Sequence, residues 1–503
     1  MTASPSEPYD LAVVGAGSAG LAGAVIASEL GLSVALLDSS TQSGGQFYRH
    51  PAPALGAVRP EALHHDWSAF SDLRRRLGAS TVDHLTGHHV WSAVREPDEA
   101  DEPGEADEAP GETDEARDAG DARENWTLHA VTGADGTEER PVRIRARALL
   151  LATGAYERQL PFPGWTLPGV VGAGGAQAML KSGLVLPGRR IVVAGSGPLL
   201  LAVASSLAAA GARVPAVVEA AGYLRYARNP RALVTNPAKA AEALVHGAAL
   251  LRHRVRVLPG SAVTEVHGTD RVEAVTVSRL DADWTPVPGT GRRIACDALA
   301  VGHGLVPQIE LATTVGCATR ALPDGTLGLV LDDLQETSVA GMWAAGETGG
   351  VGGAELARTE GELAGRAIAA RLRGRRAGAG GGRVGELRRR RDRMRAFADV
   401  MSAAHAPGPG WPAWLEDETD VCRCEEVTAG RVREAVTDLG ARDARTVKLL
   451  TRAGMGWCQG RMCGTAVACL AARGVAPEPP AERRPFAVPV PLATLAALDE
   501  PSE

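Results

Sequence analysis

The stretch YDLAVVGAGSAGLAGAVIASELGLSVALLD, residues 9–38, decides the fold. It begins with an apolar run typical of a buried strand, and a glycine-rich turn follows at residues 15–20. An Ala- and Leu-rich segment with helical periodicity comes next, and a second apolar run ends at Asp38. This order predicts a β-α-β unit of the kind that builds nucleotide-binding domains.

Three glycines in this unit have the spacing of a dinucleotide-binding turn. Gly15, Gly17 and Gly20 form G-x-G-x-x-G directly after the strand and at the start of the helix. In such a turn the first glycine permits the tight bend, the second lets the backbone approach a pyrophosphate, and the third lets helix and strand pack closely. Asp38 ends the second strand, where a carboxylate accepts hydrogen bonds from ribose hydroxyls. Because the helix N-terminus also favours phosphate, we expect a bound dinucleotide rather than an empty glycine turn.

Residues 189–219 repeat the pattern as RRIVVAGSGPLLLAVASSLAAAGARVPAVVE. Gly195 and Gly197 take the places of the first two glycines, but Leu200 stands where the third is expected. A leucine there pushes helix and strand apart, which weakens the case for a bound nicotinamide cofactor. Glu219 ends the second strand of the repeat and can accept from an unphosphorylated ribose. Two interpretations stay open: a site for NAD(H) or another adenine nucleotide, and a fold kept without a ligand.

Four of the seven cysteines lie close together, in VCRCEEV (421–427) and GMGWCQGRMCG (454–464). They form two short motifs, C-x-C and C-x4-C, and the residues are Cys422, Cys424, Cys458 and Cys463. Four thiolates suit either a tetrahedral zinc ion or a [2Fe-2S] cluster.

Glycines crowd the second cysteine pair, at positions 454, 456, 460 and 464. Backbone N–H groups exposed there can donate to the sulfurs and tune the potential of a cluster. The C-x-C motif is tight for a single zinc ion, whereas in a two-iron cluster pairs of ligands hold separate irons. We therefore favour a [2Fe-2S] cluster over structural zinc and over buried free cysteines at chance spacing.

The composition is that of a globular protein with one unusual acidic block. The chain has 503 residues, 45% of them apolar, and a formal net charge of −7. Fourteen acidic residues lie in residues 96–124, where we expect a disordered loop at the tip of a strand hairpin. Aromatic residues make up only 4%, so a nucleic-acid surface is not expected. No signal peptide or membrane-length apolar run is evident, which predicts a cytoplasmic protein.

The order of four motifs, GAGSAGL, ATGAYER, GSGPLL and WAAGE, resembles that of flavoproteins with two dinucleotide-binding domains, such as the thioredoxin reductase and glutathione reductase types. The resemblance implies an α/β fold of two Rossmann-like, three-layer ββα domains of the disulfide-reductase-like type, with FAD on the first. The residues implied to contact FAD are Gly15, Gly17, Gly20, Asp38, Thr153, Gly154, Gly346 and Glu347. Glu347 replaces the Asp of that pattern. No C-x-x-C or C-x4-C lies near a flavin domain, so disulfide reduction is not expected.

Further residues near these motifs are candidates for the flavin pocket. The loop GGQFYR, with Gly45 and Gln46, can run along an isoalloxazine ring or a ribityl chain. Residues 156–158, Tyr-Glu-Arg, follow the ATG turn and are expected to line the same pocket. No acid/base constellation stands out, so catalytic residues are not assigned, and we interpret His303 and His405 as structural.

The cysteine segment resembles the small helical [2Fe-2S] domain of the bacterioferritin-associated-ferredoxin type, although its second pair is C-x4-C rather than C-x2-C. With the flavoprotein region and the tail RRPFAVPVPL, it is similar to the large FAD subunit of opine oxidase, hydrogen cyanide synthase and proline or hydroxyproline dehydrogenase complexes. It is also similar to part of the sarcosine oxidase alpha subunit.

This resemblance implies oxidation of a CH–NH bond in an amino acid, imino acid or opine, with electrons relayed between flavin and cluster. The implied partners are a D-amino-acid-oxidase-like flavoprotein subunit, together with a small ferredoxin-like subunit. Two alternatives stay open. One is a self-contained NAD(P)H-dependent flavin and iron-sulfur reductase, and the other is a subunit whose flavin and metal are only structural.

The expected domain division has five parts. Residues 1–186 and 290–374 form a discontinuous FAD-binding domain, and residues 187–289 form the second nucleotide-binding-like domain. A linker and an amphipathic helix follow at 375–418, then the [2Fe-2S] domain at 419–477 and an extended proline-rich tail at 478–503.

Overall fold

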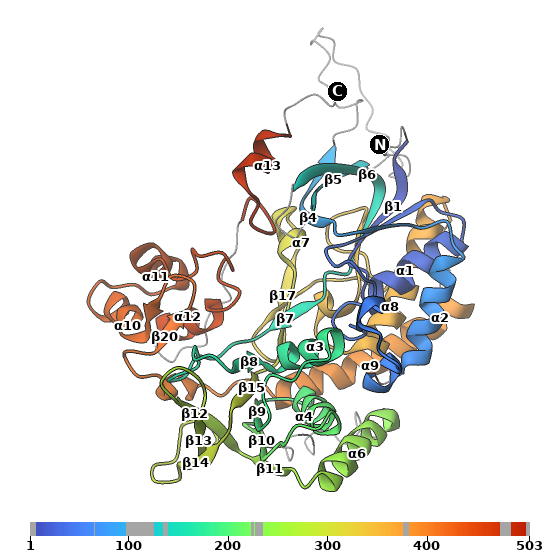
Figure 1. The fold of residues 1–503 in the computed structure, drawn as a ribbon. Coiled ribbons are helices and arrows are strands. Elements are labelled where there is room, and N and C mark those ends of the chain that lie inside the picture. Colours follow the sequence, from blue (N-terminus) through green and yellow to red (C-terminus); the bar gives the residue numbers. More distant parts are fainter. Residues whose placement is uncertain are drawn as a thin grey trace.

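The computed structural model describes residues 7–64, 66–96, 125–133, 139–222, 226, 235–375, 382–472 and 484–498. Figure 1 shows two α/β units, with a small helical module at the left of the view. Most of the acidic block, the glycine-rich part of the linker and both ends of the proline-rich tail lie outside the described residues.

The first unit is built on a seven-stranded sheet with the order β3-β2-β1-β6-β5-β4, in which β19 also pairs with β6. The strands are β1 (Tyr9–Val14), β2 (Val34–Asp38), β3 (Asp83–Thr86), β4 (His89–Glu96), β5 (Asn125–Thr132), β6 (Arg140–Leu151) and β19 (Met342–Ala344). The helices are α1 (Ser18–Glu29), α2 (Trp67–Gly78) and α8 (Ala354–Leu372). β1 pairs parallel with β2 and with β6, so the expected β-α-β unit is confirmed.

Both faces of this sheet are buried, which explains why its parallel strands are almost continuously apolar. Leu11 and Val13 pack on the side of α1 and α8. Ala12 and Val14 pack on the opposite side with Trp126 of β5. Helices therefore cover one side of the parallel strands, and the antiparallel β4-β5-β6 meander, which continues the same sheet through β6, adds to the core on the other side.

The second unit repeats this plan around a five-stranded parallel sheet with the order β11-β10-β9-β15-β8. Its strands are β8 (Val170–Gly172), β9 (Ile191–Gly195), β10 (Ala216–Glu219), β11 (Arg256–Pro259) and β15 (Ala298–Gly302). Its helices are α3 (Ala173–Gly183), α4 (Leu199–Ala209) and α6 (Pro237–Arg252). The antiparallel layer consists of β12 (Ser261–His267), β13 (Ala274–Arg279) and β14 (Arg292–Ala295).

Sheet membership differs from the expected domain limits at two points. β8 lies before residue 187 and β15 lies after residue 289, yet both belong to the second sheet. A three-residue strand such as β8 is too short to show a hydrophobic period. The place of β15 beside β9 is set by pairing between residues about a hundred positions apart, which local sequence patterns do not reveal.

The acidic block joins the two strands expected to flank it. β4 and β5 are antiparallel, and Glu96 pairs with Asn125 across the ladder. These residues stand immediately before and after the part of the block that lies outside the described residues. The two flanking strands therefore form the expected hairpin.

Short elements lie outside the two main sheets. They are η1 (Pro53–Leu55), η2 (Pro60–Leu63), β7 (Ala155–Glu157), β16 (Leu305–Pro307), α7 (Glu310–Thr314), β17 (Thr319–Ala321), β18 (Leu327–Leu329) and η5 (Gly346–Gly349). Among the residues that the structure describes, no helix combines the length and the apolar character needed to cross a bilayer.

The C-terminal part begins with the long helix α9 (Gly382–Ala404). After η6 (Trp411–Trp414), the cysteine module contains β20 (Asp420–Cys422), β21 (Val427–Thr428), α10 (Ala429–Thr437), α11 (Ala444–Thr451) and α12 (Gly464–Ala471), and α13 (Leu492–Ala496) lies beyond it. Thr428 and Asp443 cap α10 and α11 by accepting the N–H groups of Arg431 and Thr446. Such caps stabilise short helices by about 1 kcal/mol each.

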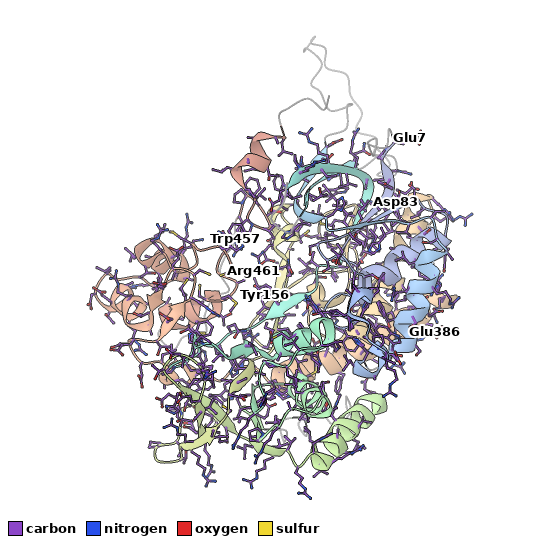
Figure 2. All side chains as sticks on the ribbon, in the orientation of Figure 1. Glu7, Asp83, Tyr156, Glu386, Trp457 and Arg461 are labelled. Atoms are coloured by element: carbon purple, nitrogen blue, oxygen red, sulfur yellow. The ribbon has the colours of Figure 1, made fainter. Side chains whose placement is uncertain are left out.

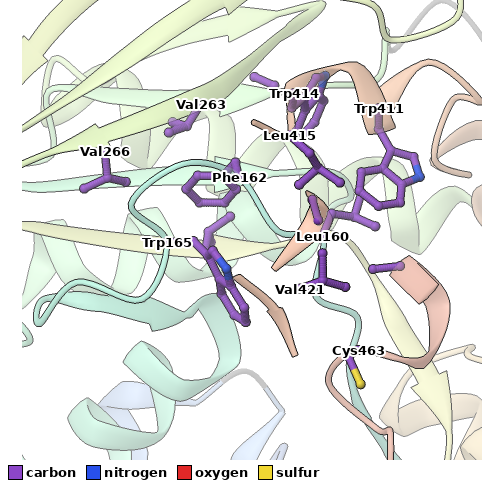
Figure 3. Close-up of a cluster of buried hydrophobic side chains, with 14 of the residues drawn as sticks. Leu160, Phe162, Trp165, Val263, Val266, Trp411, Trp414, Leu415, Val421 and Cys463 are labelled. Carbon is purple, nitrogen blue, oxygen red and sulfur yellow. The ribbon is translucent and has the colours of Figure 1, made fainter. Parts of the chain in front are cut away.

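The cysteine module shares a hydrophobic core with the second unit. Figure 3 shows this core, which includes Leu160, Phe162, Trp165, Val263, Val266, Trp411, Trp414, Leu415, Val421 and Cys463. The indole N–H of Trp165 also donates to the carbonyl oxygen of Asp420 at 2.7 Å. The module is therefore packed against the second unit through a common apolar core.

Candidate functional site

The first glycine turn has the geometry that its sequence predicts. Gly15 has a φ of +105°, and a Cβ there would collide with the carbonyl oxygen of Ala152. A Cβ on Gly20 would collide with the carbonyl group of Gly15, so the helix and the strand approach closely. Gly17 differs, because the nearest atom to a Cβ there is the Cα of Gly45 at 3.9 Å. The first and third glycines thus serve packing, and the second presents bare backbone.

Asp38 ties this turn to the end of β2. One carboxylate oxygen accepts the N–H of Ala16 at 2.6 Å, and the other accepts the N–H of Ser40 at 2.7 Å. The side chain is only partly buried. Each carboxylate oxygen has a second lone pair, so Asp38 can still accept from a ribose hydroxyl.

The glycine loop after Asp38 lies against the first turn. The N–H of Gly44 donates to the carbonyl oxygen of Ala16 at 2.8 Å, and the Gln46 amide oxygen accepts from Arg49 at 2.8 Å. A cavity of about 220 Å³ opens beside this loop. Its lining includes Ser40, Thr41, Gln42, Ser43, Gly45, Arg49, His50 and Ser182. The expected loop is therefore next to both the glycine turn and an open cavity.

The ATG turn also meets the first glycine turn. Ala152, which precedes Thr153, donates its N–H to the carbonyl oxygen of Val14 at 2.9 Å. The hydroxyl of Thr153 donates to the carbonyl oxygen of Gln308. The N–H of Gln308 in turn donates to the carbonyl oxygen of Gly154 at 2.9 Å. The turn is thus held between β1 and the segment after β16.

The late WAAGE motif joins the same region through Gly346. Gly346 has a φ of +82°, and a Cβ there would stand 3.1 Å from the Cβ of Ala19 in α1. Glu347 accepts the N–H groups of Gly352 at 2.7 Å and Gly353 at 3.1 Å. Burial raises the pKa of Glu347, and the two N–H donors counter this. The carboxylate is thus occupied by its own loop, and its expected contact with a flavin stays a prediction.

Two residues after the ATG turn, Glu157 and Arg158, are paired with groups further along the chain. Arg158 is 2% exposed, and its ion pair with Asp324 has an N–O distance of 2.7 Å. Glu157 accepts the N–H groups of Gly174 at 2.7 Å and Gly175 at 3.2 Å, at the start of α3. Burial raises the pKa of Glu157, against these donors. These two side chains therefore join the two units.

The second glycine turn is built like the first but is more enclosed. Gly195 has a φ of +134°, and a Cβ there would collide with Gly302. Leu200 is 1% exposed and packs in the apolar core under α4. Glu219 is fully buried and accepts the N–H groups of Gly197 at 3.1 Å and Ala221 at 3.0 Å. His405, far along the chain, lies 3.5 Å from the same carboxylate.

The four cysteines of the C-terminal module come together as two pairs. Cys422 and Cys463 are buried and share a side-chain hydrogen bond, and Cys424 and Cys458 form a second such pair nearer the surface. Each pair therefore joins one cysteine from each sequence motif. Within the described part of the chain, no group of three or more Cys, His, Asp or Glu side chains lies together as a metal site, and the four sulfurs are present as two separate pairs. Two pairs match a cluster in which separate irons have separate ligands.

A backbone N–H favours the thiolate form of one of these sulfurs, that of Cys422. The N–H of Gly454 points to the sulfur of Cys422 at 3.5 Å, as expected from the glycines around the second motif. The hydrogen bond from Cys463, helped by this N–H, lowers the pKa of Cys422 to about 5. The partner shows the opposite shift, because the pKa of Cys463 is raised by that hydrogen bond and by burial.

Arg461 connects the cysteine module to the first unit. It stands between Cys458 and Cys463 in the sequence and makes an ion pair with Glu310 of α7 at 2.9 Å. Its guanidinium also donates to the carbonyl oxygen of Ala487 at 2.7 Å. Figure 2 labels Arg461, Trp457 and Tyr156 in the region between the module and the rest of the molecule. In a chain so rich in arginine, no sequence signal distinguishes this residue.

Comparison with known proteins identifies the class. Residues 9–361 match the pyridine nucleotide-disulphide oxidoreductase family, and residues 421–473 match the BFD-like [2Fe-2S] binding domain. The chain belongs to the pyridine nucleotide-disulphide oxidoreductase family. It is a FAD-dependent oxidoreductase with a C-terminal [2Fe-2S] domain, as the sequence predicted.

Relatives that align along most of this chain identify a smaller group within this family. The chain is 31% identical to the hydrogen cyanide synthase subunit HcnB of Pseudomonas protegens, over 90% of this chain and 89% of the relative. It is 32% identical to the A subunit of opine oxidase from Agrobacterium tumefaciens, over 92% of this chain and 85% of the relative. The fold is similar to that of L-proline dehydrogenase from P. horikoshii, with a TM-score of 0.62 and 18% identity over 97% of this chain and 79% of that one. The first two relatives are subunits of larger enzymes.

Proposed function

We propose that this chain is the electron-relaying FAD subunit of a complex that oxidises a CH–NH bond of an amino acid, imino acid or opine. Its partners in this proposal are a D-amino-acid-oxidase-like flavoprotein subunit, together with a small ferredoxin-like subunit. Similarity to subunits of hydrogen cyanide synthase and opine oxidase along nearly the whole chain supports the proposal. The support for the substrate class comes from what these relatives are named for. The support for electron relay comes from the structure of this chain.

In this proposal FAD lies across the first glycine turn. Gly17 and the N-terminus of α1 bind the pyrophosphate, because that glycine leaves backbone N–H groups open to an anion. Asp38 accepts from the ribose, and the loop with Gly45 and Gln46 covers the ligand. Thr153, Gly154, Gly346 and Glu347 complete the site. The convergence of these segments at the first turn supports the assignment.

The [2Fe-2S] cluster is held in this proposal by Cys422, Cys424, Cys458 and Cys463. When bound, the flavin accepts two electrons at a time and the cluster transfers them singly. The N–H of Gly454 stabilises the buried thiolate side of the site, whereas Cys424 is exposed. A partly exposed cluster can pass electrons to a protein that docks on that side.

The observation that carries the relay is the packing of the cysteine module against both units. Trp165 holds β20 through its bond to Asp420, and Arg461 holds the C-x4-C loop to Glu310. Oxidation of a CH–NH bond to C=N releases two electrons and two protons, so a one-electron acceptor must be reduced twice per turnover. A fixed distance between flavin and cluster suits this repeated transfer.

The test is anaerobic reduction of the purified chain, alone and co-expressed with a neighbouring flavoprotein gene product. Flavin and cluster absorbance are followed after addition of D- or L-imino acids, opines or NADH. The proposal expects bleaching by an imino acid or opine, and only with the partner present. Bleaching of the lone chain by NADH would instead assign it to the self-contained reductases. A lack of redox change with dithionite would contradict any electron-relaying role.

A further inference from the structure

We propose that His405 closes the second glycine motif from within the chain, because its imidazole occupies the place that the adenosine ribose of a dinucleotide would take. NADH and related nucleotides are then excluded until the segment that follows α9 moves away. This inference goes beyond the proposed function and stands without it.

The imidazole of His405 is held on three sides by the second unit. Its Nδ1 lies 3.2 Å from the hydroxyl of Ser196 and 3.5 Å from the carboxylate of Glu219. Its Nε2 lies 2.9 Å from the hydroxyl of Tyr226. Ser196 also donates to the carbonyl oxygen of His405 at 3.2 Å. His405 is 8% exposed, so the site is closed to solvent.

One arrangement of protons satisfies every group in this network. The Nδ1–H of His405 donates towards Glu219, and Nε2 accepts from the phenol of Tyr226. Burial and the charge of Glu219 raise the pKa of Tyr226, which keeps its hydroxyl protonated as a donor. The contacts around the imidazole are therefore complete without a ligand.

The same positions bind nucleotide in a working dinucleotide site. The acid at the end of the second strand accepts ribose hydroxyls, and the glycine turn approaches the pyrophosphate. Glu219 and the Ser196–Gly197 turn are those positions here, and both contact His405 or its closest neighbours. An imidazole and a ribose cannot share this space, so their binding is mutually exclusive.

The first motif provides the internal comparison. Asp38 and Glu219 each accept one N–H from their own glycine turn. Each also accepts the N–H of the residue two positions after the acid itself. Asp38 nevertheless stays partly exposed, whereas Glu219 is fully buried beneath His405. The two turns thus have similar backbone hydrogen bonds. They differ in exposure, because His405 covers Glu219 whereas Asp38 stays partly exposed.

The segment that carries His405 is anchored at both ends. Before it, Arg395 of α9 pairs with the buried Glu360 and donates to the carbonyl oxygen of Gly350. After it, the N–H of Gly410 donates to the carbonyl oxygen of Asp283 at 2.7 Å. Removal of His405 from the motif therefore requires a local opening of this segment, and the anchors favour the closed state.

The test is binding of NADH and of ADP-ribose to the full-length holoprotein, measured by calorimetry. We expect His405→Ala to bind ADP-ribose at least tenfold more tightly than the parent protein. His253→Ala is the matched control, because His253 is an exposed histidine of the same unit at the end of α6. It should leave the affinity unchanged. Equal affinity of His405→Ala and the parent, including no binding by either, would overturn the proposal.

Two further variants keep the result interpretable. Adding Gly197→Val to His405→Ala should abolish the gained binding, because a valine is strained at the φ of +118° of Gly197 and its side chain enters the open space at the turn. If His405→Ala does not fold, Tyr226→Phe replaces it, since it removes one hydrogen bond to the imidazole and keeps the ring. It should give a smaller gain in affinity, together with faster amide exchange in residues 404–410. No change in either quantity would contradict closure by His405.

Discussion

At the scale of single residues, the proposed metal chemistry depends on four cysteines. They lie near one another in the sequence, and folding sets which of them pair. The four cysteines are close in sequence, but the pairs are Cys422 with Cys463 and Cys424 with Cys458. The N–H of Gly454 adds a donor to the buried pair. The sulfurs thus have partners and polarity that suit metal-bound thiolates.

Replacement of one cluster cysteine gives the most direct test of the metal assignment. We expect Cys458→Ala to remove the visible and electron-paramagnetic signals of the cluster while FAD stays bound, because the first glycine turn lies elsewhere. Cys469→Ala is the control, since Cys469 lies in α12 of the same module and outside the four ligands. A cluster spectrum that survives Cys458→Ala would contradict the assignment.

A buried histidine makes stability depend on pH. Burial and the charge of Arg158 lower the pKa of His303 to about 3, and the ring packs near Trp284 and Trp414. In the unfolded state His303 binds a proton as the pH falls through about 6.5, whereas in the native state it binds one only near pH 3. This contribution is complete above pH 6.5 and is lost as the pH falls. Between pH 7 and 4.5 the contribution of His303 to the free energy of unfolding should fall by about 2 kcal/mol.

The measurement is urea unfolding of the parent and of His303→Leu at both pH values. The variant should lose about 2 kcal/mol less than the parent over this interval, because leucine binds no proton. His253→Leu changes an exposed histidine and should show the same loss as the parent. Parallel behaviour of the parent and His303→Leu would show that His303 does not control this dependence.

At the scale of elements, the two glycine turns show how one local pattern serves different ends. Both follow a buried parallel strand, and both use a glycine with positive φ at their first position. In the first motif the third glycine packs against the strand, whereas Leu200 fills the core under α4 in the second. Only the first turn has all three glycines that close approach to a pyrophosphate requires.

Equivalent substitutions in the two turns should separate their roles. We expect Gly17→Val to yield protein without FAD, because a valine side chain would fill the space between the turn and Gly45. Gly197→Val is the corresponding change in the second turn and should leave FAD content unchanged; because Gly197 has a φ of +118°, folding of this variant is checked by circular dichroism. FAD content is read from the absorbance of the released flavin per protein. A yellow Gly17→Val protein would contradict the placement of FAD.

At the scale of the whole molecule, the cysteine module is part of one packed body. Its core is continuous with the core of the second unit (Figure 3). Arg461 reaches the first unit at Glu310. Both side chains of this ion pair are largely buried, at 16% and 7% exposure. Removing one partner of such a pair costs more than the pair itself contributes.

Arg461→Ala should therefore weaken the link between module and flavoprotein. We expect the free energy of unfolding to fall by about 2–3 kcal/mol, and electron transfer between flavin and cluster to slow in stopped-flow measurements. Arg452→Ala is the control, because its ion pair with Glu425 lies at the surface and its arginine is 69% exposed. That change should cost less than about 0.5 kcal/mol. Equal effects of the two substitutions would show that the Arg461 contact does not hold the module.

Much of this architecture was predictable from the sequence. Each of these features depends on residues within about thirty positions of one another: the β-α-β units, the first glycine motif and the two cysteine motifs. Patterns at such short range can be recognised in the sequence alone. The α9 helix and the hairpin beside the acidic block were predictable for the same reason. The sequence therefore determined the fold class, the FAD and [2Fe-2S] chemistry and the order of the units.

Only the tertiary structure decided how these parts meet. It joined β15 to β9, paired the cysteines across their motifs and brought His405 onto Ser196, 209 residues earlier in the chain. It also covered Glu219 while it left Asp38 partly open, although the two acids end similar strands. These outcomes depend on which apolar faces pack together and which polar groups they enclose, and local spacing carries no information about either.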